Sequence, residues 1–256
     1  MKNQFLLTPF FLDQPRAFES LSQSDWIVNT PGLTERDVQP RMSQIHEALA
    51  QHIAHTLKRG ARPISVMGDC CGTIGVVAGL QRTGQDFVLL WLDAHGDFNT
   101  WETTPSGFLG GMPLAMLVGR GEQTMPLAVQ LQTLNEERVV LCDARDLDPG
   151  EKIGLENSRV HHILDARELL KSEILNAPLY IHFDTDIVNP LDAPAQSYAT
   201  AGGPSAQELR DIFRALAQSK NIVAVSMCAW NPNLDADGKT RAVSMELLRV
   251  LIGEEK

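Results

Sequence analysis

Eight short, strongly apolar segments recur along this chain of 256 residues, and stretches with the spacing of amphipathic helices separate several of them. The apolar segments are 4–8, 25–29, 63–67, 87–92, 138–142, 160–164, 179–183 and 222–227. The helical stretches are 41–59, 72–82, 111–119, 166–175, 205–219 and 241–252. Strands of a parallel sheet are apolar along their whole length, because helices cover both faces of such a sheet. The pattern predicts a three-layer α/β/α fold around a mostly parallel sheet of about eight strands.

The chain is predicted to form one domain. Apolar residues recur at every fourth position from Ile45 to Leu57, as in a helix that faces a core. Gly60 and Pro63 follow, and a glycine with a later proline is the usual end of a helix. No linker rich in glycine, serine or proline, no repeat and no low-complexity segment interrupts the sequence. We therefore expect a single domain over residues 1–256.

The composition excludes several classes of partner. The chain has 22 basic and 32 acidic side chains, a net charge of −10, whereas nucleic acids and anionic membranes attract clustered lysine and arginine. No run approaches the roughly 18 apolar residues of a membrane helix, and Pro9 and Asp13 interrupt the apolar N-terminus, which argues against a secretory signal. The four cysteines, of which Cys70 and Cys71 are adjacent, form no disulfide framework. We expect a cytoplasmic protein in a reducing compartment.

Polar motifs follow four of the predicted strands. They are MGDCCG (67–72), DAHGD (93–97), DARDLD (143–148) and DTD (184–186). Ligands of an open α/β sheet collect beyond the carboxyl ends of its strands, so these motifs are expected at one edge. Asp93, His95 and Asp97 alternate, as do Asp184 and Asp186, so in an extended chain each set points to one side.

Clustered carboxylates of this kind need cations. A single DxD motif is common in turns and helix caps and is weak evidence for a metal site. The evidence for a metal site comes from the combination of the motifs. Two divalent ions would neutralise the cluster, and oxygen ligands with one imidazole suit Mn²⁺. Two metals with shared carboxylates hold a hydroxide that acts as a nucleophile at neutral pH. The sequence therefore predicts a binuclear metal site.

The motifs resemble those of the ureohydrolase family, and specifically its arginase branch. Members carry GGDHS, DAHxD and DxDxxDP at three strand ends and bind two Mn²⁺ ions there. The corresponding segments here are MGDCC (67–71), DAHGD (93–97) and DTDIVNP (184–190). Segments 93–113, 145–151 and 231–235 are similar as well, so the resemblance extends over most of the chain.

The resemblance implies the roles of ten residues. The metal ligands would be Cys70, Asp93, His95, Asp97, Asp184 and Asp186, and the substrate contacts would be Asn99, Ser106, Asp148 and Glu151. Asp93 and Asp184 would bridge the ions, and Asp97 would also orient the attacking hydroxide, as the catalytic residue. Asn99 and Ser106 would meet the α-carboxylate of an arginine-like amino acid. Asp148 and Glu151 would meet its α-ammonium group.

The sequence departs from the family pattern where proton transfer and guanidinium contact are expected. Cys70 replaces a histidine ligand, Gly110 a proton-shuttle histidine, and Ala229 a glutamate that faces the guanidinium. Asn189 replaces the last aspartate of DxDxxDP, and PAQSYA (194–199) replaces PGTGTP. A thiolate beside divalent ions is a competent ligand. An N-hydroxyguanidine is less basic than a guanidinium and needs less counter-charge. The pattern resembles the Nω-hydroxy-L-arginine hydrolase of cycloserine biosynthesis, and implies that this substrate yields L-ornithine and hydroxyurea by attack of the metal-bridging hydroxide.

Other interpretations stay open. One is an arginase that acts on L-arginine or on another guanidino acid, and another is a catalytically inactive relative that binds a metal or a ligand. A zinc deacetylase is a weaker alternative, because the residues that match amino-acid contacts would then have no function. A thiol redox role is also weaker, because the adjacent pair Cys70 and Cys71 lacks the CxxC spacing of such sites. Cys70 also makes Fe²⁺, Co²⁺ or Zn²⁺ compatible with the site. Beyond a small guanidino amino acid we expect no partner, and the short C-terminus favours a monomer over a trimer.

Overall fold

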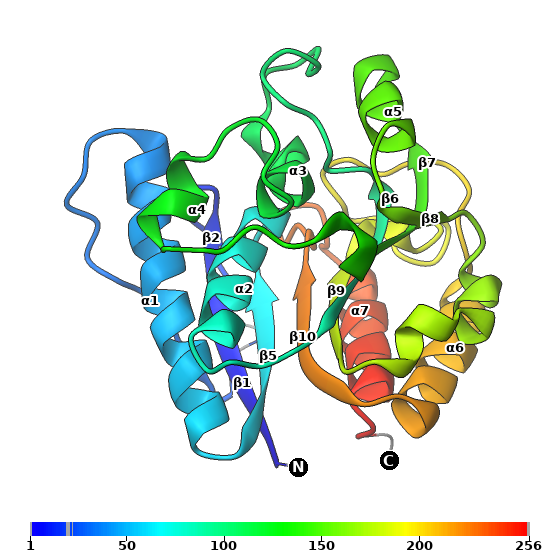
Figure 1. Ribbon diagram of the computed structural model, residues 1–256. Helices are drawn as coiled ribbons and strands as arrows, with labels where there is room; N and C mark the ends of the chain where they lie inside the picture. Colours follow the sequence, from blue (N-terminus) through cyan, green and yellow to red (C-terminus); the bar gives the residue numbers. More distant parts are fainter. Residues whose placement is uncertain (1, 19–20, 22, 255–256) are drawn as a thin grey trace. The chain divides into compact units, whose positions relative to one another are not determined.

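The computed structural model describes residues 2–18, 21 and 23–254 (Figure 1). The chain divides into two compact units. The first comprises residues 1–86, 97–136 and 148–159, and the second comprises residues 87–96, 137–147 and 160–256. The prediction of one domain over the whole chain stays a prediction.

The first unit is built on three parallel strands. They lie in the order β4-β1-β5, with β1 at Lys2–Thr8, β4 at Ile27–Val28 and β5 at Ala61–Met67. The helices are α1 (Val38–Lys58), α2 (Thr73–Gln81), α3 (Pro113–Leu117), α4 (Thr124–Ala128) and α5 (Pro149–Glu156). A short antiparallel hairpin pairs β2 (Phe10–Phe11) with β3 (Gln14–Pro15). Two 3-10 turns, Cys70–Gly72 and Leu109–Gly111, complete the unit.

Helices α1 and α2 lie side by side because two glycines let their backbones approach (Figure 1). Gly75 and Gly79 are four residues apart and therefore share one face of α2. An added Cβ at Gly75 would lie 2.7 Å from the carbonyl oxygen of His46. At Gly79 it would lie 2.5 Å from Cβ of Ile53 and 2.8 Å from the carbonyl oxygen of Ala50. The two helices can keep this separation only if neither position carries a side chain.

The variant Gly79→Ala is expected to lower the free energy of unfolding by about 2 kcal/mol. Overpacking costs about 1–3 kcal/mol, and the better helix propensity of alanine returns only part of that cost. Gly32→Ala is the matched control, because nothing lies within 4 Å of the Cβ position there. Urea titrations of both variants measure the effect, and an unchanged midpoint for Gly79→Ala would contradict the close packing.

The second unit contains five parallel strands and two long helices. The strands are β6 (Val88–His95), β7 (Val139–Asp146), β8 (His161–Ile163), β9 (Leu179–Asp184) and β10 (Ile222–Cys228). They lie in the order β10-β9-β6-β7-β8. Helices α6 (Ala206–Ser219) and α7 (Lys239–Leu251) pack on each other, and Ala166–Lys171, Glu173–Asn176 and Thr185–Ile187 form 3-10 turns.

The strand order of the second unit reverses between β6 and β9. From β6 the chain proceeds to β7 and β8 on one side, whereas β9 is followed by β10 on the other. Ligands of open α/β sheets bind outside the carboxyl ends of the strands at such a reversal. The topology therefore directs attention to the ends of β6 and β9.

Most predicted elements are confirmed, and the errors concern short helices. All eight apolar segments form strands, three in the first unit and five in the second. The prediction of one helix over 166–175 was wrong, because Ser172 has an extended backbone (φ −76°, ψ 116°) and separates two 3-10 turns. The helices α4 and α5 and the β2–β3 hairpin were not predicted. α5 has only eight residues and contains Gly150 and Gly154, so no apolar periodicity marks it.

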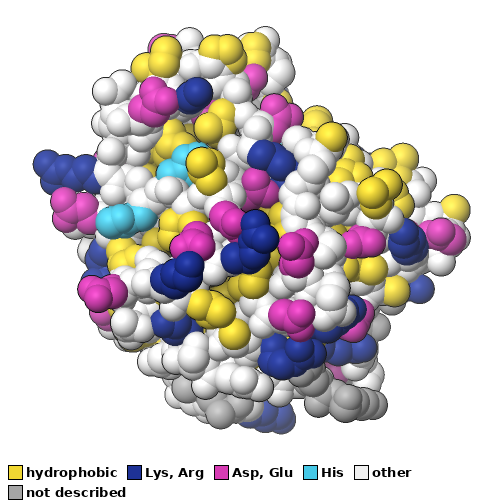
Figure 2. Space-filling model, turned by 90° about the vertical axis from the view of Figure 1, so that its right-hand side faces the viewer, with side chains coloured by type: hydrophobic (Ala, Val, Ile, Leu, Met, Phe, Trp, Pro, Cys, Tyr) yellow, Lys and Arg dark blue, Asp and Glu magenta, His cyan; other side chains and the backbone are white. Residues whose placement is uncertain are grey.

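On the side that Figure 2 draws, acidic and basic side chains are interspersed. Among residues 2–18, 21 and 23–254, no helix combines the length and apolar character that crossing a membrane requires.

Candidate functional site

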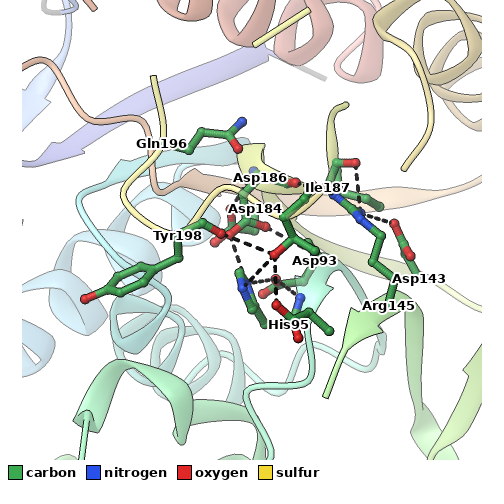
Figure 3. Close-up of polar contacts among 12 residues, drawn as sticks. Asp93, His95, Asp143, Arg145, Asp184, Asp186, Ile187, Gln196 and Tyr198 are labelled. Atoms are coloured by element: carbon green, nitrogen blue, oxygen red, sulfur yellow. Dashed lines mark hydrogen bonds and ion pairs between the residues drawn. The ribbon is translucent and has the colours of Figure 1, made fainter. Parts of the chain in front are cut away.

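The ends of β6 and β9 bring four of the predicted metal ligands together (Figure 3). Asp93 and His95 close β6, and Asp184 ends β9 with Asp186 in the turn that follows. Ligand atoms of Asp93, His95 and Asp186 all lie within 4.8 Å of one another. Asp184 joins this set through one carboxylate oxygen, which accepts a hydrogen bond of 2.8 Å from the backbone N–H of Asp186. The expectation that these strand ends meet is confirmed within the second unit.

The side chain of His95 lies between two carboxylates. Its Nδ1 is 3.0 Å from Oδ2 of Asp186 and 3.4 Å from Oδ1 of Asp93. Its backbone N–H donates to Asp93 Oδ1 at 2.7 Å, and that of Ala94 donates to Asp186 Oδ1 at 3.2 Å. On the far side of the ring, Nε2 is 3.3 Å from the hydroxyl of Thr200. The backbone thus fixes both carboxylates, and Nδ1 is the ring nitrogen directed at them.

The electrostatics of this cluster match a cation site. Burial, together with the neighbouring Asp186 carboxylate, raises the pKa of Asp93 to about 6. Burial opposes the charged form of His95, but its contacts with Asp186 and Asp93 outweigh burial and raise its pKa to about 12. A proton on the imidazole thus offsets one of the two carboxylate charges that face it. A divalent ion would displace that proton, since metal ligands bind in their deprotonated forms. The donor set of two carboxylates and an imidazole therefore fits a divalent metal.

Two buried side chains donate hydrogen bonds to two of these carboxylates. The indole Nε1 of Trp91 donates to Asp93 Oδ2 at 3.0 Å, and the thiol of Cys228 donates to Asp184 Oδ2 at 3.3 Å. Partners of this kind orient metal ligands and tune their affinity. Cys228, buried at the end of β10, is therefore a hydrogen-bond donor to a candidate metal ligand as well as part of the core. His182, 3.6 Å from Cys228, is buried, and burial lowers its pKa to about 3.

The end of β7 supplies Arg145, whose side chain joins two segments of the backbone near the cluster. The guanidinium of Arg145 pairs with Asp143 and donates to four backbone carbonyls. Those carbonyls belong to Asp186 (3.0 Å), Ile187 (3.3 Å), Thr200 (3.0 Å) and Ala201 (3.2 Å). One side chain thus ties the turn that carries Asp186 to the loop that carries Thr200.

A bulge in β7 aims Arg145 at these carbonyls. The pairing with β6 passes from Asp93–Asp143 to His95–Asp146, so two residues of β7 oppose one of β6. Asp143 (φ 74°) and Ala144 (φ 49°) both adopt left-handed backbone conformations, which are strained for residues other than glycine. Bulges beside active sites commonly redirect a side chain in this way.

Cys70 and Asp97 belong to the first unit. Cys70 is buried and opens the 3-10 turn after β5, which Asp69 caps by accepting from the backbone N–H of Cys71 at 2.8 Å. Asp97 is buried at a positive φ of 48°, and its carbonyl accepts from the N–H groups of Leu114 (3.0 Å) and Ala115 (3.2 Å). The backbone therefore fixes both residues tightly. Their roles as metal ligands stay predictions.

The first unit brings three of the four predicted substrate contacts together. The amide of Asn99 donates to Asp148 Oδ2 at 2.9 Å. Glu151 accepts from the backbone N–H of Phe98 at 2.8 Å and of Asp148 at 3.2 Å, so it closes a capping box at the start of α5. Ser106 is exposed and accepts from the N–H of Phe108 at 3.2 Å, and no hydrogen bond among the described residues joins it to the other three. Their roles toward a substrate stay predictions.

The space at Gly110 is filled by an aromatic ring. A Cβ added there would lie 2.4 Å from the ring of Phe108, which stacks on Phe11 with ring centroids 6.1 Å apart. A side chain at position 110 would therefore have to displace Phe108. The ring therefore occupies the place that a side chain at position 110 would take.

Comparisons with known proteins identify similar sequences and similar structures. The sequence pattern of the arginase family matches residues 19–253. An arginase from Bacillus caldovelox is 30% identical over 227 residues, which are 84% of this chain and 76% of that protein. The structure of B. caldovelox arginase superposes with a TM-score of 0.84 and 26% identity, covering 100% of this chain and 99% of that one. A formimidoylglutamase structure from Bacillus subtilis has the same fold, with a TM-score of 0.75 and 15% identity, over 99% of this chain and 87% of that one.

These matches confirm the predicted fold class, a mostly parallel sheet of eight strands with flanking helices. Because the fold is shared with a formimidoylglutamase, it leaves the substrate undetermined. The family assignment rests on the matched pattern, the sequence identity and the strand-end carboxylates together. The chain belongs to the arginase family and is a metal-dependent hydrolase of guanidino-type C–N bonds.

Proposed function

We propose that this protein hydrolyses Nω-hydroxy-L-arginine to L-ornithine and hydroxyurea. The observation that carries the hydrolase assignment is the buried Asp93–His95–Asp186 cluster at the ends of β6 and β9 in a chain of the arginase family. The substrate rests on two further positions. Ala229 offers no anionic group to a guanidinium, and Phe108 fills the space beside Gly110. A less basic N-hydroxyguanidine needs neither a full counter-charge nor a dedicated proton shuttle.

The proposed metal ligands are Cys70, Asp93, His95, Asp97, Asp184 and Asp186, and the proposed ions are two Mn²⁺. When bound, the ions supply a water molecule that is activated as a nucleophile at neutral pH. Asp97 orients that water and passes its proton to the leaving amine. Asn99 and Ser106 bind the α-carboxylate, and Asp148 and Glu151 bind the α-ammonium group. A C–O bond forms at the guanidino carbon and the C–Nδ bond breaks, so one water is consumed for each ornithine released.

The Asp97→Asn variant is expected to lower kcat at least about 100-fold, because positioned general acids and bases contribute about 10²–10⁴-fold. An amide keeps the shape of the side chain but accepts no proton. Ornithine release measures kcat, and metal content and circular dichroism of the same sample verify that the variant is folded and loaded. Turnover within threefold of the wild type would remove Asp97 from the mechanism.

Hydrolysis of L-arginine is the second candidate, because the similar proteins named above include arginases. Ornithine release by the Mn²⁺-loaded protein, with both substrates measured side by side, separates the two. Ornithine from the hydroxylated substrate alone supports the proposal. Efficient release from L-arginine identifies an arginase that tolerates Gly110 and Ala229. Release from neither, with metal bound, favours another guanidino acid or a binding protein and contradicts the proposal.

The setting of the reaction is part of the proposal. The four cysteines carry free thiols, which supports a reducing, cytoplasmic location. We further propose that the protein acts as a monomer on a small guanidino amino acid.

A further inference from the structure

We propose that the side-chain oxygen of Gln196 accepts a hydrogen bond from the guanidino group of the substrate and so determines specificity. The inference rests on the proposed function, since it names a contact to the same substrate.

The segment that carries Gln196 is held against the chain that follows β10. Gln196 and Trp230 form an isolated antiparallel bridge, and the N–H of Asn231 donates to the carbonyl of Ala195 at 3.0 Å. Ala229 makes this possible, because its left-handed backbone (φ 68°) turns the chain directly after the strand. These backbone contacts give Gln196 a defined position.

The amide of Gln196 reaches the turn that carries the metal ligands. Its Nε2 donates to the backbone carbonyl of Thr185 at 2.5 Å, and Thr185 stands between Asp184 and Asp186 in the chain. A carbonyl accepts only, so this contact assigns the nitrogen to Thr185 and leaves the oxygen free to face elsewhere. In the view of Figure 3 that oxygen lies on the side of Asp184 and Asp186.

The oxygen of Gln196 is a buried acceptor in need of a donor. The residue is only 4% exposed, and Oε1 has no hydrogen-bond partner among the described residues. Leaving such a group unpaired is costly, so native proteins supply a partner from the chain, an ordered water or a ligand. A guanidino group carries N–H donors, which makes it the complement of this oxygen.

The chemistry of an amide oxygen also bears on the choice of substrate. A carboxylate favours a full guanidinium cation, whereas a neutral amide oxygen binds N–H donors without requiring that charge. Ala229, next to the residue that pairs with Gln196, has no polar side chain. Gln196 is therefore an acceptor suited to a weakly basic N-hydroxyguanidine.

The test compares recognition of the guanidino end with recognition of the amino-acid end. In the Gln196→Met variant, kcat/KM for Nω-hydroxy-L-arginine is expected to fall about 10- to 100-fold, the usual range for one lost hydrogen bond to a polar or charged group. The inhibition constant of L-ornithine, which lacks the guanidino group, is expected to stay within about twofold. Ser197→Ala is the matched control, since it alters the neighbouring side chain of the same loop and is expected to change neither constant.

The Gln196→Glu variant supplies a second measurement. A carboxylate there is expected to raise the ratio of kcat/KM for L-arginine over Nω-hydroxy-L-arginine at least about fivefold. Equal losses for Nω-hydroxy-L-arginine and L-ornithine in Gln196→Met, or an unchanged kcat/KM, would overturn the inference and assign Gln196 to the loop or to a buried water. If the wild type turns over neither guanidino compound, the proposed function fails. In that case the binding of L-arginine and of L-ornithine to the wild type and to Gln196→Met is measured by calorimetry. Weaker binding of L-arginine alone in the variant supports the inference, and equal losses for both ligands overturn it.

Discussion

Replacing Asp186 with asparagine is expected to weaken Mn²⁺ binding by more than about 100-fold and to abolish measurable ornithine release. Loss of an outer partner of a metal ligand already costs about 10–100-fold in affinity, and Asp186 is itself a proposed ligand. Its carboxylate lies 3.0 Å from His95 Nδ1 and accepts from the N–H of Ala94, so asparagine keeps the shape but removes the charge. Calorimetric titration with Mn²⁺ and metal analysis after dialysis measure the affinity.

The control for this variant is Asp211→Asn on α6. Asp211 is an exposed carboxylate on α6 that pairs with Arg214. Its replacement removes one negative charge outside the Asp93–His95–Asp186 cluster. Metal content and turnover are expected to equal those of the wild type. Wild-type metal content in Asp186→Asn would exclude the Asp93–His95–Asp186 cluster as the metal site.

Replacing Arg145 with alanine is expected to lower the free energy of unfolding by about 3 kcal/mol, the lower end of the cost of removing one partner of a buried ion pair, because the Arg145 side chain is still 15% exposed. The change leaves Asp143 without its cation and four carbonyls without a donor. Lysine keeps the charge but lacks the planar fork of five donors, so Arg145→Lys is expected to recover only part of the loss. Urea unfolding followed by circular dichroism measures both variants.

Arg167→Ala is the matched control for the loss of an arginine. Arg167 pairs with Asp165 on the surface, where its side chain is 69% exposed, and exposed pairs contribute about 0–1 kcal/mol. A stability loss for Arg145→Ala no greater than that for Arg167→Ala would show that the contacts of Arg145 with the Asp186 turn contribute little.

The strand ends could be predicted from the sequence because they depend on local pattern and on one topological rule. Asp93 with His95, and Asp184 with Asp186, each follow an unbroken apolar run, and parallel strands place such ends at one edge. The alternation along β6 agrees with the structure, where Asp93 and His95 both reach the carboxylate cluster that includes Asp186. The fold class and the cluster of candidate metal ligands were accessible for the same reason.

The supporting residues depend on strand register and backbone conformation, which the sequence leaves open. Cys228 reaches Asp184 because β10 and β9 pair in a register that sets these two residues opposite each other. Gln196 reaches Thr185 only through a bridge to Trp230, a contact between loops. One signal was available: Tyr180, His182 and Asp184 alternate along β9, which marks a polar face on an otherwise apolar strand.

Arg145 was visible in the sequence only as part of a motif. Its role requires left-handed conformations at Asp143 and Ala144, and neither residue type announces them as glycine would. The short helix α5 was not predicted for a related reason. Its capping box consists of Asp148 and Glu151, which were interpreted as substrate contacts and not as the start of a helix.

The measurement that tests the central claim most directly is hydrolysis of Nω-hydroxy-L-arginine in ¹⁸O-labelled water, with both products analysed by mass spectrometry. Attack of water on the guanidino carbon places one labelled oxygen in the carbonyl of hydroxyurea and none in L-ornithine. That result, together with loss of the reaction in Asp186→Asn, is the one we predict. Label in ornithine, or no cleavage by the Mn²⁺-loaded protein, would contradict hydrolysis of a guanidino C–N bond by this site.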